Sequence, residues 1–190
     1  MNTHEPAALC VLTTDGIETN ALTEAAEMVL RMQLNGQAVS VRCRPDTRLL
    51  TLLREYWHLV GAKPGCEVGR CGACMVWFNG APANACLLMA YQLQGQSVRT
   101  IESLREDPAS APVKDALDAC GGVQCGYCTA GMVVHLTWLH QQSPRPSFAD
   151  AEAMMCGNLC RCTGYGGIRR AMRELFEDNR SATGATARTS

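Results

Sequence analysis

Cysteine spacing is the feature that most constrains how this chain can fold. Eight of the twelve cysteines in its 190 residues fall into two groups of four. The groups are Cys66-x4-Cys71-x2-Cys74-x11-Cys86 and Cys125-x2-Cys128-x31-Cys160-x1-Cys162. If each group acts as a unit, the fold has to bring four sulfur atoms together in two places.

Such a density of cysteines is typical of secreted disulfide scaffolds and of intracellular metal-binding proteins. Residues 1–30 contain five acidic residues and no lysine or arginine. A secretory signal needs a positively charged start and an apolar core, and a twin-arginine signal needs its arginine pair. The sequence therefore favours a reducing cytoplasm, in which clustered cysteines usually bind metal.

The first group has the spacing of plant-type ferredoxins, in which four thiolates hold a [2Fe–2S] cluster. Three of its cysteines are so close in sequence that the backbone has to form a tight cup. Gly65, Gly69 and Gly72 permit such a cup, because glycine allows positive φ and close approach of the chain. A structural zinc site normally has paired Cys-x2-Cys knuckles, which this run lacks. The group therefore predicts single-electron transfer.

The second group is ambiguous when it is taken alone. Cys125 and Cys128 lie where one predicted helix ends and the next begins, and Cys160 and Cys162 lie at a matching junction. Free N–H groups and the positive dipole end of a helix favour thiolates and an anionic cluster. Cys-x2-Cys combined with Cys-x-Cys is also compatible with zinc. Both kinds of metal site stay open for this group.

Composition excludes several function classes. The net charge of −1 gives no electrostatic case for binding nucleic acid or an anionic membrane surface. No apolar run approaches the roughly 20 residues of a membrane-spanning helix. No Ser-His-Asp set or carboxylate pair is evident, so we expect no catalytic residues for substrate chemistry in this chain.

The first half of the sequence predicts a small α+β domain. Asn35-Gly36 and Asn79-Gly80 are favoured two-residue hairpin turns between extended runs. An amphipathic helix is expected between the two hairpins and a further strand after them, over 47–57 and 97–101. We expect this domain to cover 32–105, preceded by a disordered or loosely docked extension over 1–31.

The second half predicts an all-helical domain over 113–178. A linker is expected around Pro108 and Pro112, where composition changes. Helices are expected over 113–120, 128–141, 148–156 and 165–178. Ser147 is placed to cap the third of these helices. The remainder, 179–190, is expected to be a flexible tail.

Three segments together resemble the iron–sulfur small subunit of the molybdenum hydroxylases, the xanthine dehydrogenase, aldehyde oxidase and carbon monoxide dehydrogenase family. The segments are Gly65-Cys66-x4-Cys71-Gly72-Ala73-Cys74, Val123-Gln124-Cys125-Gly126-Tyr127-Cys128-Thr129-Ala130-Gly131 and Gly157-Asn158-Leu159-Cys160-Arg161-Cys162-Thr163-Gly164-Tyr165. The resemblance covers about 32–176. One departure is Ala130, where the family usually has proline.

The resemblance implies a β-grasp ferredoxin-like domain followed by a four-helix domain, with a [2Fe–2S] cluster in each. It implies a large partner subunit that carries molybdopterin and a medium subunit that carries FAD, in a heterotrimer or a dimer of heterotrimers. The helical-domain cluster would lie nearest the pterin, and Gln124 and the Cys162 region would contact it.

These expectations lead to one preferred function and two alternatives. The preferred function is electron transfer in an oxidoreductase that hydroxylates a heterocycle, aldehyde or similar substrate. A free-standing ferredoxin-like carrier is the first alternative, although such carriers rely on a strongly charged docking face. A zinc-stabilised interaction module is the second. The cysteines outside the two groups within the resemblance are expected to be small buried residues: Cys43, Cys120 and Cys156.

Overall fold

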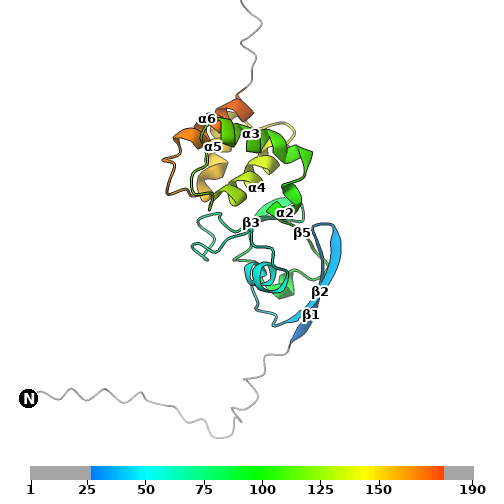
Figure 1. Ribbon diagram of the computed structural model, residues 1–190. Helices are drawn as coiled ribbons and strands as arrows, with labels where there is room; N and C mark the ends of the chain where they lie inside the picture. Colours follow the sequence, from blue (N-terminus) through cyan, green and yellow to red (C-terminus); the bar gives the residue numbers. More distant parts are fainter. Residues whose placement is uncertain (1–26, 178–190) are drawn as a thin grey trace, which may run out of the picture.

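The structure, a computed structural model, describes residues 27–177. Figure 1 shows a sheet-containing part in its lower half and a bundle of helices above it. The expectations for residues 1–26 and for the C-terminal tail lie outside the described residues. None of the helices between residues 27 and 177 is long and apolar enough to cross a bilayer.

The sheet has five strands in the order β2-β1-β5-β3-β4. They are β1 (Met28–Leu34), β2 (Gln37–Cys43), β3 (Met75–Phe78), β4 (Ala81–Asn84) and β5 (Ser97–Arg99). β1 pairs with β2 and β3 pairs with β4 as antiparallel hairpins, whereas β5 runs parallel to β1. Both predicted turns are confirmed: Asn35 and Gly36 have positive φ, as do Asn79 and Gly80.

A helical segment covers the sheet between the two hairpins. It begins as α1 (Leu49–Thr51) and continues as a π-helical turn, η2 (Leu52–Tyr56), so the predicted helix is present but its second half is wider than an α-helix. Leu49, Leu52 and Leu53 are fully buried against Leu30 of β1. A short 3₁₀ turn, η3 (Ala90–Gln92), completes this lobe.

The expected linker is a chain of short helical turns. α2 (Ile101–Leu104) follows β5, and η4 (Pro108–Ser110) leads directly into α3. Asp107 accepts a hydrogen bond from the amide of Ala109 and so caps η4. Proline fits here because its missing N–H is not needed in the first helical turn. The segment predicted as a linker over 108–112 is therefore helical and forms η4 and the start of α3.

Four longer helices follow the linking turns. They are α3 (Ala111–Ala119), α4 (Thr129–His140), α5 (Phe148–Met154) and α6 (Gly166–Phe176), with a 3₁₀ turn, η5 (Met155–Gly157), after α5. Ser147 caps α5 by accepting from the amide of Asp150, as predicted. Side chains of all four helices share one hydrophobic core, separate from that of the sheet.

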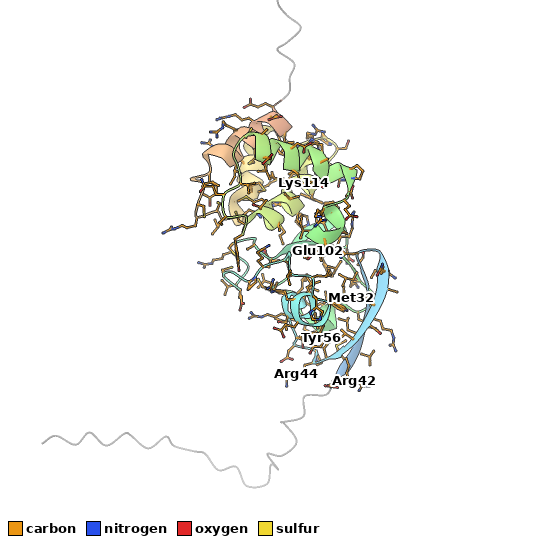
Figure 2. All side chains as sticks on the ribbon, in the orientation of Figure 1. Met32, Arg42, Arg44, Tyr56, Glu102 and Lys114 are labelled. Carbon is orange, nitrogen blue, oxygen red and sulfur yellow. The ribbon has the colours of Figure 1, made fainter. Side chains whose placement is uncertain are left out.

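β3 and α4 join the two lobes. Met75 and Trp77 of β3 form a third buried cluster with Leu104 of α2 and Val134 of α4. Glu102 of α2 is a further connection to the sheet lobe, because its carboxylate accepts a hydrogen bond from the amide of Gly61 at 2.8 Å. Figure 2 shows Glu102 between the sheet and the helices, with Arg42 and Arg44 at the far end of the first hairpin.

The first strand is longer than the sequence analysis predicted. It begins at Met28, four residues before the expected start of the domain at Met32. Arg31 pairs with Ser40 and Met28 pairs with Cys43. Residues 28–31 therefore belong to the sheet and not to the extension.

Candidate metal centres

The first cysteine group lies on the loop between η2 and β3 and on the turn after β4. Cys74 and Cys86 are buried beside the hydrophobic core of the sheet. Cys66 and Cys71 are partly exposed. The structure thus gives the group an inner pair, held by the sheet, and an outer pair on the loop.

Backbone amides of the loop point at the outer sulfur atoms. The Sγ of Cys66 accepts from the amides of Arg70 and Cys71, at 3.1 and 3.3 Å, and the Sγ of Cys71 accepts from the amide of Cys66 at 3.4 Å. Gly65 permits this approach, since a Cβ there would lie 2.8 Å from the Sγ of Cys71. Gly72 has a φ of +69°, which favours glycine.

Cys66 of the outer pair and Cys74 of the inner pair differ in the acidity of their thiols. Hydrogen bonds from the backbone, chiefly at Val68, lower the pKa of Cys66 to about 7. Burial raises the pKa of Cys74 to about 12. The loop thus stabilises negative charge on its outer sulfur, whereas Cys74 would need a bound metal to remain a thiolate.

The second cysteine group joins two loops of the helical lobe. Cys128 directly precedes α4, as predicted, but Cys162 lies four residues before the start of α6. The Sγ atoms of Cys125 and Cys162 lie 3.5 Å apart, and both residues are exposed. This group therefore has one edge open at the surface.

Hydrogen bonds again shift the pKa values of thiols in this group. Burial acts to raise the pKa of Cys160, but hydrogen bonds from the side chain and backbone of Thr163 help to leave it below its usual value. The Thr163 hydroxyl lies 3.2 Å from this sulfur. A hydrogen bond from the backbone of Tyr127 lowers the pKa of Cys125, and burial raises that of Cys128 to about 12.

The two cysteine groups are neighbours across the junction of the lobes. The amide of Leu159, which precedes Cys160, donates to the carbonyl oxygen of Cys71 at 2.9 Å. Gly131 of α4 packs so closely on the first loop that a Cβ there would lie 2.0 Å from the oxygen of Gly72. A cavity of about 240 Å³ is lined by cysteines of both groups, Cys66, Cys71, Cys125, Cys128, Cys160 and Cys162.

The donor set fits iron–sulfur clusters. Among residues 27–177, no group of three or more His, Cys, Asp or Glu side chains is arranged to hold a single metal ion. Each cysteine group does offer four thiols, with N–H or O–H donors aimed at several of the sulfur atoms. The buried Nδ2 of Asn158 adds a donor that has no partner within the described chain. Such donors offset the negative charge of a cluster.

The other residues singled out from the sequence differ in their exposure. Gln124 and Arg161 are exposed beside the second group. Ala130 lies in the first turn of α4.

The cysteines outside the two groups have different environments. Cys43 is buried as predicted, but Cys156 is exposed and Cys120 is partly exposed, so the prediction of burial was wrong for these two. Sequence reasoning gave no role to Tyr127 or Asn158, which contact the first cysteine loop across the junction.

Comparison with known proteins agrees with this geometry. Residues 32–90 match the family described as "2Fe-2S iron-sulfur cluster binding domain", and residues 100–173 match "[2Fe-2S] binding domain". The chain is 49% identical over 148 residues to one subunit of the probable xanthine dehydrogenase of Bacillus subtilis, covering 74% of this chain and 81% of that protein. It is 40% identical over 151 residues to the nicotinate dehydrogenase small FeS subunit of Eubacterium barkeri, covering 80% and 96%.

Solved structures give the same assignment. The crystal structure of quinoline 2-oxidoreductase from Pseudomonas putida 86 contains a chain that superposes with a TM-score of 0.69 at 37% identity, covering 77% of this chain and 90% of that one. Both cysteine groups lie within the residues matched to these two domain families, and one of the relatives is the small FeS subunit of a nicotinate dehydrogenase. This chain therefore belongs to the family of [2Fe–2S] small subunits of the molybdenum hydroxylases.

Proposed function

We propose that this chain relays single electrons within a molybdenum hydroxylase, from a molybdopterin subunit to a flavin subunit. One [2Fe–2S] cluster would be held by Cys66, Cys71, Cys74 and Cys86, and the other by Cys125, Cys128, Cys160 and Cys162. When bound, these clusters supply one-electron redox chemistry. The chain's own residues supply position, shielding and hydrogen bonds to sulfur. The observation that carries the proposal is the contact between the two cysteine loops at Leu159 and Cys71.

The second cysteine group is the better candidate for the side that faces molybdopterin. Cys125, Cys162 and Gln124 lie together at the surface, so a partner subunit can approach them directly. Gln124 presents an amide that can pair with polar atoms of a pterin edge. We propose Gln124 and Cys162 as the contacts to the pterin.

The first cysteine group would then face the electron acceptor. Two exposed aliphatic side chains flank its loop: Val68 is 62% exposed and Leu87 is 53% exposed. Gly69 packs against Leu87, since a Cβ there would lie 2.4 Å from it. An apolar rim around a redox site is typical of a surface that a partner covers. We propose that the flavin subunit docks here.

The two lobes correspond to the domains expected of such a subunit. The five-stranded sheet with its crossing helical segment supports a β-grasp ferredoxin-like domain, which would begin at Met28. The shared core of α3, α4, α5 and α6 supports a four-helix domain. We infer that both are domains of one rigid relay, because buried residues of both lobes pack together at β3 and α4.

We further propose that this chain acts in a heterotrimer, or a dimer of heterotrimers, in the cytoplasm. The eleven cysteines of the described residues are free thiols, and thiols that bind iron need a reducing compartment. The holoenzyme would hydroxylate a heterocycle, an aldehyde or a similar substrate, since relatives include a nicotinate dehydrogenase subunit and an aldehyde oxidoreductase subunit of Escherichia coli. A free-standing carrier is less well supported, because the similar small chains are subunits of larger enzymes.

Co-purification of the full complex with a tag on this chain tests the proposal. The complex should contain four iron and four acid-labile sulfide atoms per copy of this chain, together with molybdopterin. Cys162→Ser should damage one cluster and spare the other, whereas Cys156→Ser should spare both, because Cys156 is exposed but outside the two groups. Gln124→Ala should keep both clusters and slow their reduction by molybdenum. A stable monomeric chain with no affinity for a molybdopterin subunit would contradict the proposal.

A further inference from the structure

Tyr127 connects the two cysteine loops through its side chain. It lies between Cys125 and Cys128 of the second group, yet its hydroxyl donates to the carbonyl oxygen of Pro64 at 2.5 Å. Pro64 is two residues before Cys66 of the first group. A residue of one cysteine loop is therefore bonded to the backbone that enters the other.

A cation strengthens the same contact. The Nζ of Lys63 lies 5.9 Å from the centroid of the Tyr127 ring, within the range of a cation–π interaction. Lys63 is held by two further bonds: its Nζ donates to the oxygen of Gly61, and its amide donates to the oxygen of Ala73. The ring of Tyr127 thus rests on a segment that is fixed to the first loop, although Tyr127 is 48% exposed.

A second set of contacts also holds the two loops together. Asn158 accepts a hydrogen bond at its Oδ1 from the Nδ1 of the buried His135, at 2.7 Å. Its Nδ2 packs on the first loop, only 2.6 Å from where a Cβ of Gly72 would be. The bond between Leu159 and Cys71 lies next to Asn158 in the chain. The loops are therefore fixed by the contacts at Asn158 and Leu159 as well as by Tyr127.

We propose that Tyr127 is a positioning residue that fixes the separation and orientation of the two cysteine groups and so sets the rate of electron transfer between them. The inference rests on the proposed function. Because the contacts at Asn158 and Leu159 remain without the hydroxyl, Tyr127→Phe should leave the fold and both clusters in place. The loop around Cys125 would then be free to shift relative to Cys66.

The test compares Tyr127→Phe with the wild type in the purified complex. A matched control is Tyr91→Phe, since Tyr91 is an exposed tyrosine on η3 in the first lobe and belongs to neither cysteine loop. Electron paramagnetic resonance of the dithionite-reduced complex reports the magnetic interaction between the two reduced clusters as a splitting. In a separate, oxidised sample, a pulse of methyl viologen radical delivers one electron and reports how fast it equilibrates between the clusters.

We expect Tyr127→Phe to change the splitting and to slow re-equilibration, with iron content and both midpoint potentials unchanged, and Tyr91→Phe to match the wild type. The splitting arises only in molecules that hold both reduced clusters, so partial iron loss does not disturb the reading. A splitting and rate equal to those of the wild type would overturn the inference. So would complete loss of the second cluster, which would make Tyr127 an assembly residue. A wild-type complex without two clusters would instead contradict the proposed function.

Discussion

Trp77 donates a hydrogen bond from its Nε1 to the carbonyl oxygen of Val134 at 2.9 Å, and the bond is buried. It runs from β3 of the sheet to α4 of the helical lobe. Arg99 stacks on the same ring at 5.1 Å and pairs with Asp107 at 2.8 Å. Trp77 therefore connects the sheet, the linking turns and α4, the helix that follows Cys125 and Cys128.

Trp77→Phe should lower the free energy of unfolding of the full chain by about 1–3 kcal/mol. The change removes one buried hydrogen bond and part of a buried ring, while a ring remains for Arg99. Urea unfolding followed by circular dichroism measures the effect. Trp57→Phe is the matched control, because Trp57 is only partly buried against the core of the sheet lobe. Equal destabilisation by both changes would argue against a special role for the junction.

Thr163→Val should lower the reduction potential of the second cluster. The Thr163 hydroxyl lies 3.2 Å from the Sγ of Cys160, and a donor to sulfur stabilises the more negative, reduced state. A hydrogen bond worth roughly 0.5–1.5 kcal/mol corresponds to a shift on the order of 20–60 mV for one electron. Redox titration followed by electron paramagnetic resonance measures both clusters separately.

Thr163→Ser is the control for this change, because serine keeps the hydroxyl. Its second-cluster potential should stay near that of the wild type, and the first-cluster potential should not move in either variant. A shift of equal size in both variants would mean that the methyl group, and not the hydrogen bond, sets the potential.

Acid should destabilise the helical lobe through His140. Burial, and then the nearby Arg145, lower the pKa of His140 below its usual value. As pH falls through about 6.5, the unfolded chain takes up a proton that the folded chain does not, so the free energy of unfolding decreases. Burial also lowers the pKa of His135, which adds to the same trend.

His140→Gln should therefore flatten, but not abolish, the loss of stability between about pH 7 and pH 5.5. Denaturant midpoints of wild type and variant, measured across this range, give the comparison. The residual slope is expected because His135 is unchanged. Identical slopes would show that His140 is not a source of the acid sensitivity.

Local sequence signals predicted the parts of the fold that depend on near neighbours. Asn-Gly at 35–36 and 79–80 fixed both hairpin turns, and Ser147 marked the start of α5. The contacts between Leu159 and Cys71, and between Trp77 and Val134, join residues far apart in the chain. They arise from packing of the two lobes, which no periodicity or spacing encodes.

Two features of the fold differ from the simplest expectation although the sequence contains their signals. Proline at 108 and 112 indicates a linker, but proline is equally suited to the first turn of a helix, where both residues lie. The first strand begins earlier than predicted, and its signal is the alternation of Leu30, Met32 and Leu34 with the polar Arg31 and Gln33. The π-helical turn at 52–56 had no such signal, since its apolar residues also fit an α-helix.

The corrected start of the first strand predicts where the chain can be shortened. β1 pairs with β2 through seven residue pairs, and four of these involve residues 28–31. Leu30 is fully buried, and the backbone of Arg31 bonds to both Gln94 and Gly95. A chain that begins at Met32 loses these contacts and leaves much of β2 without a partner strand. Burial of Leu30 alone is worth about 1.5–3 kcal/mol.

A chain that begins at Glu27 should therefore keep full iron content and wild-type thermal stability, because every pair of the sheet remains. A chain that begins at Met32 should unfold at a lower temperature and lose iron first from the cluster of the sheet lobe, because Cys74 and Cys86 are buried beside the core that contains Leu30. Iron analysis and electron paramagnetic resonance of both shortened chains, within the complex, distinguish the two outcomes. Equal iron content and stability of the two shortened chains would show that residues 28–31 are dispensable to the sheet.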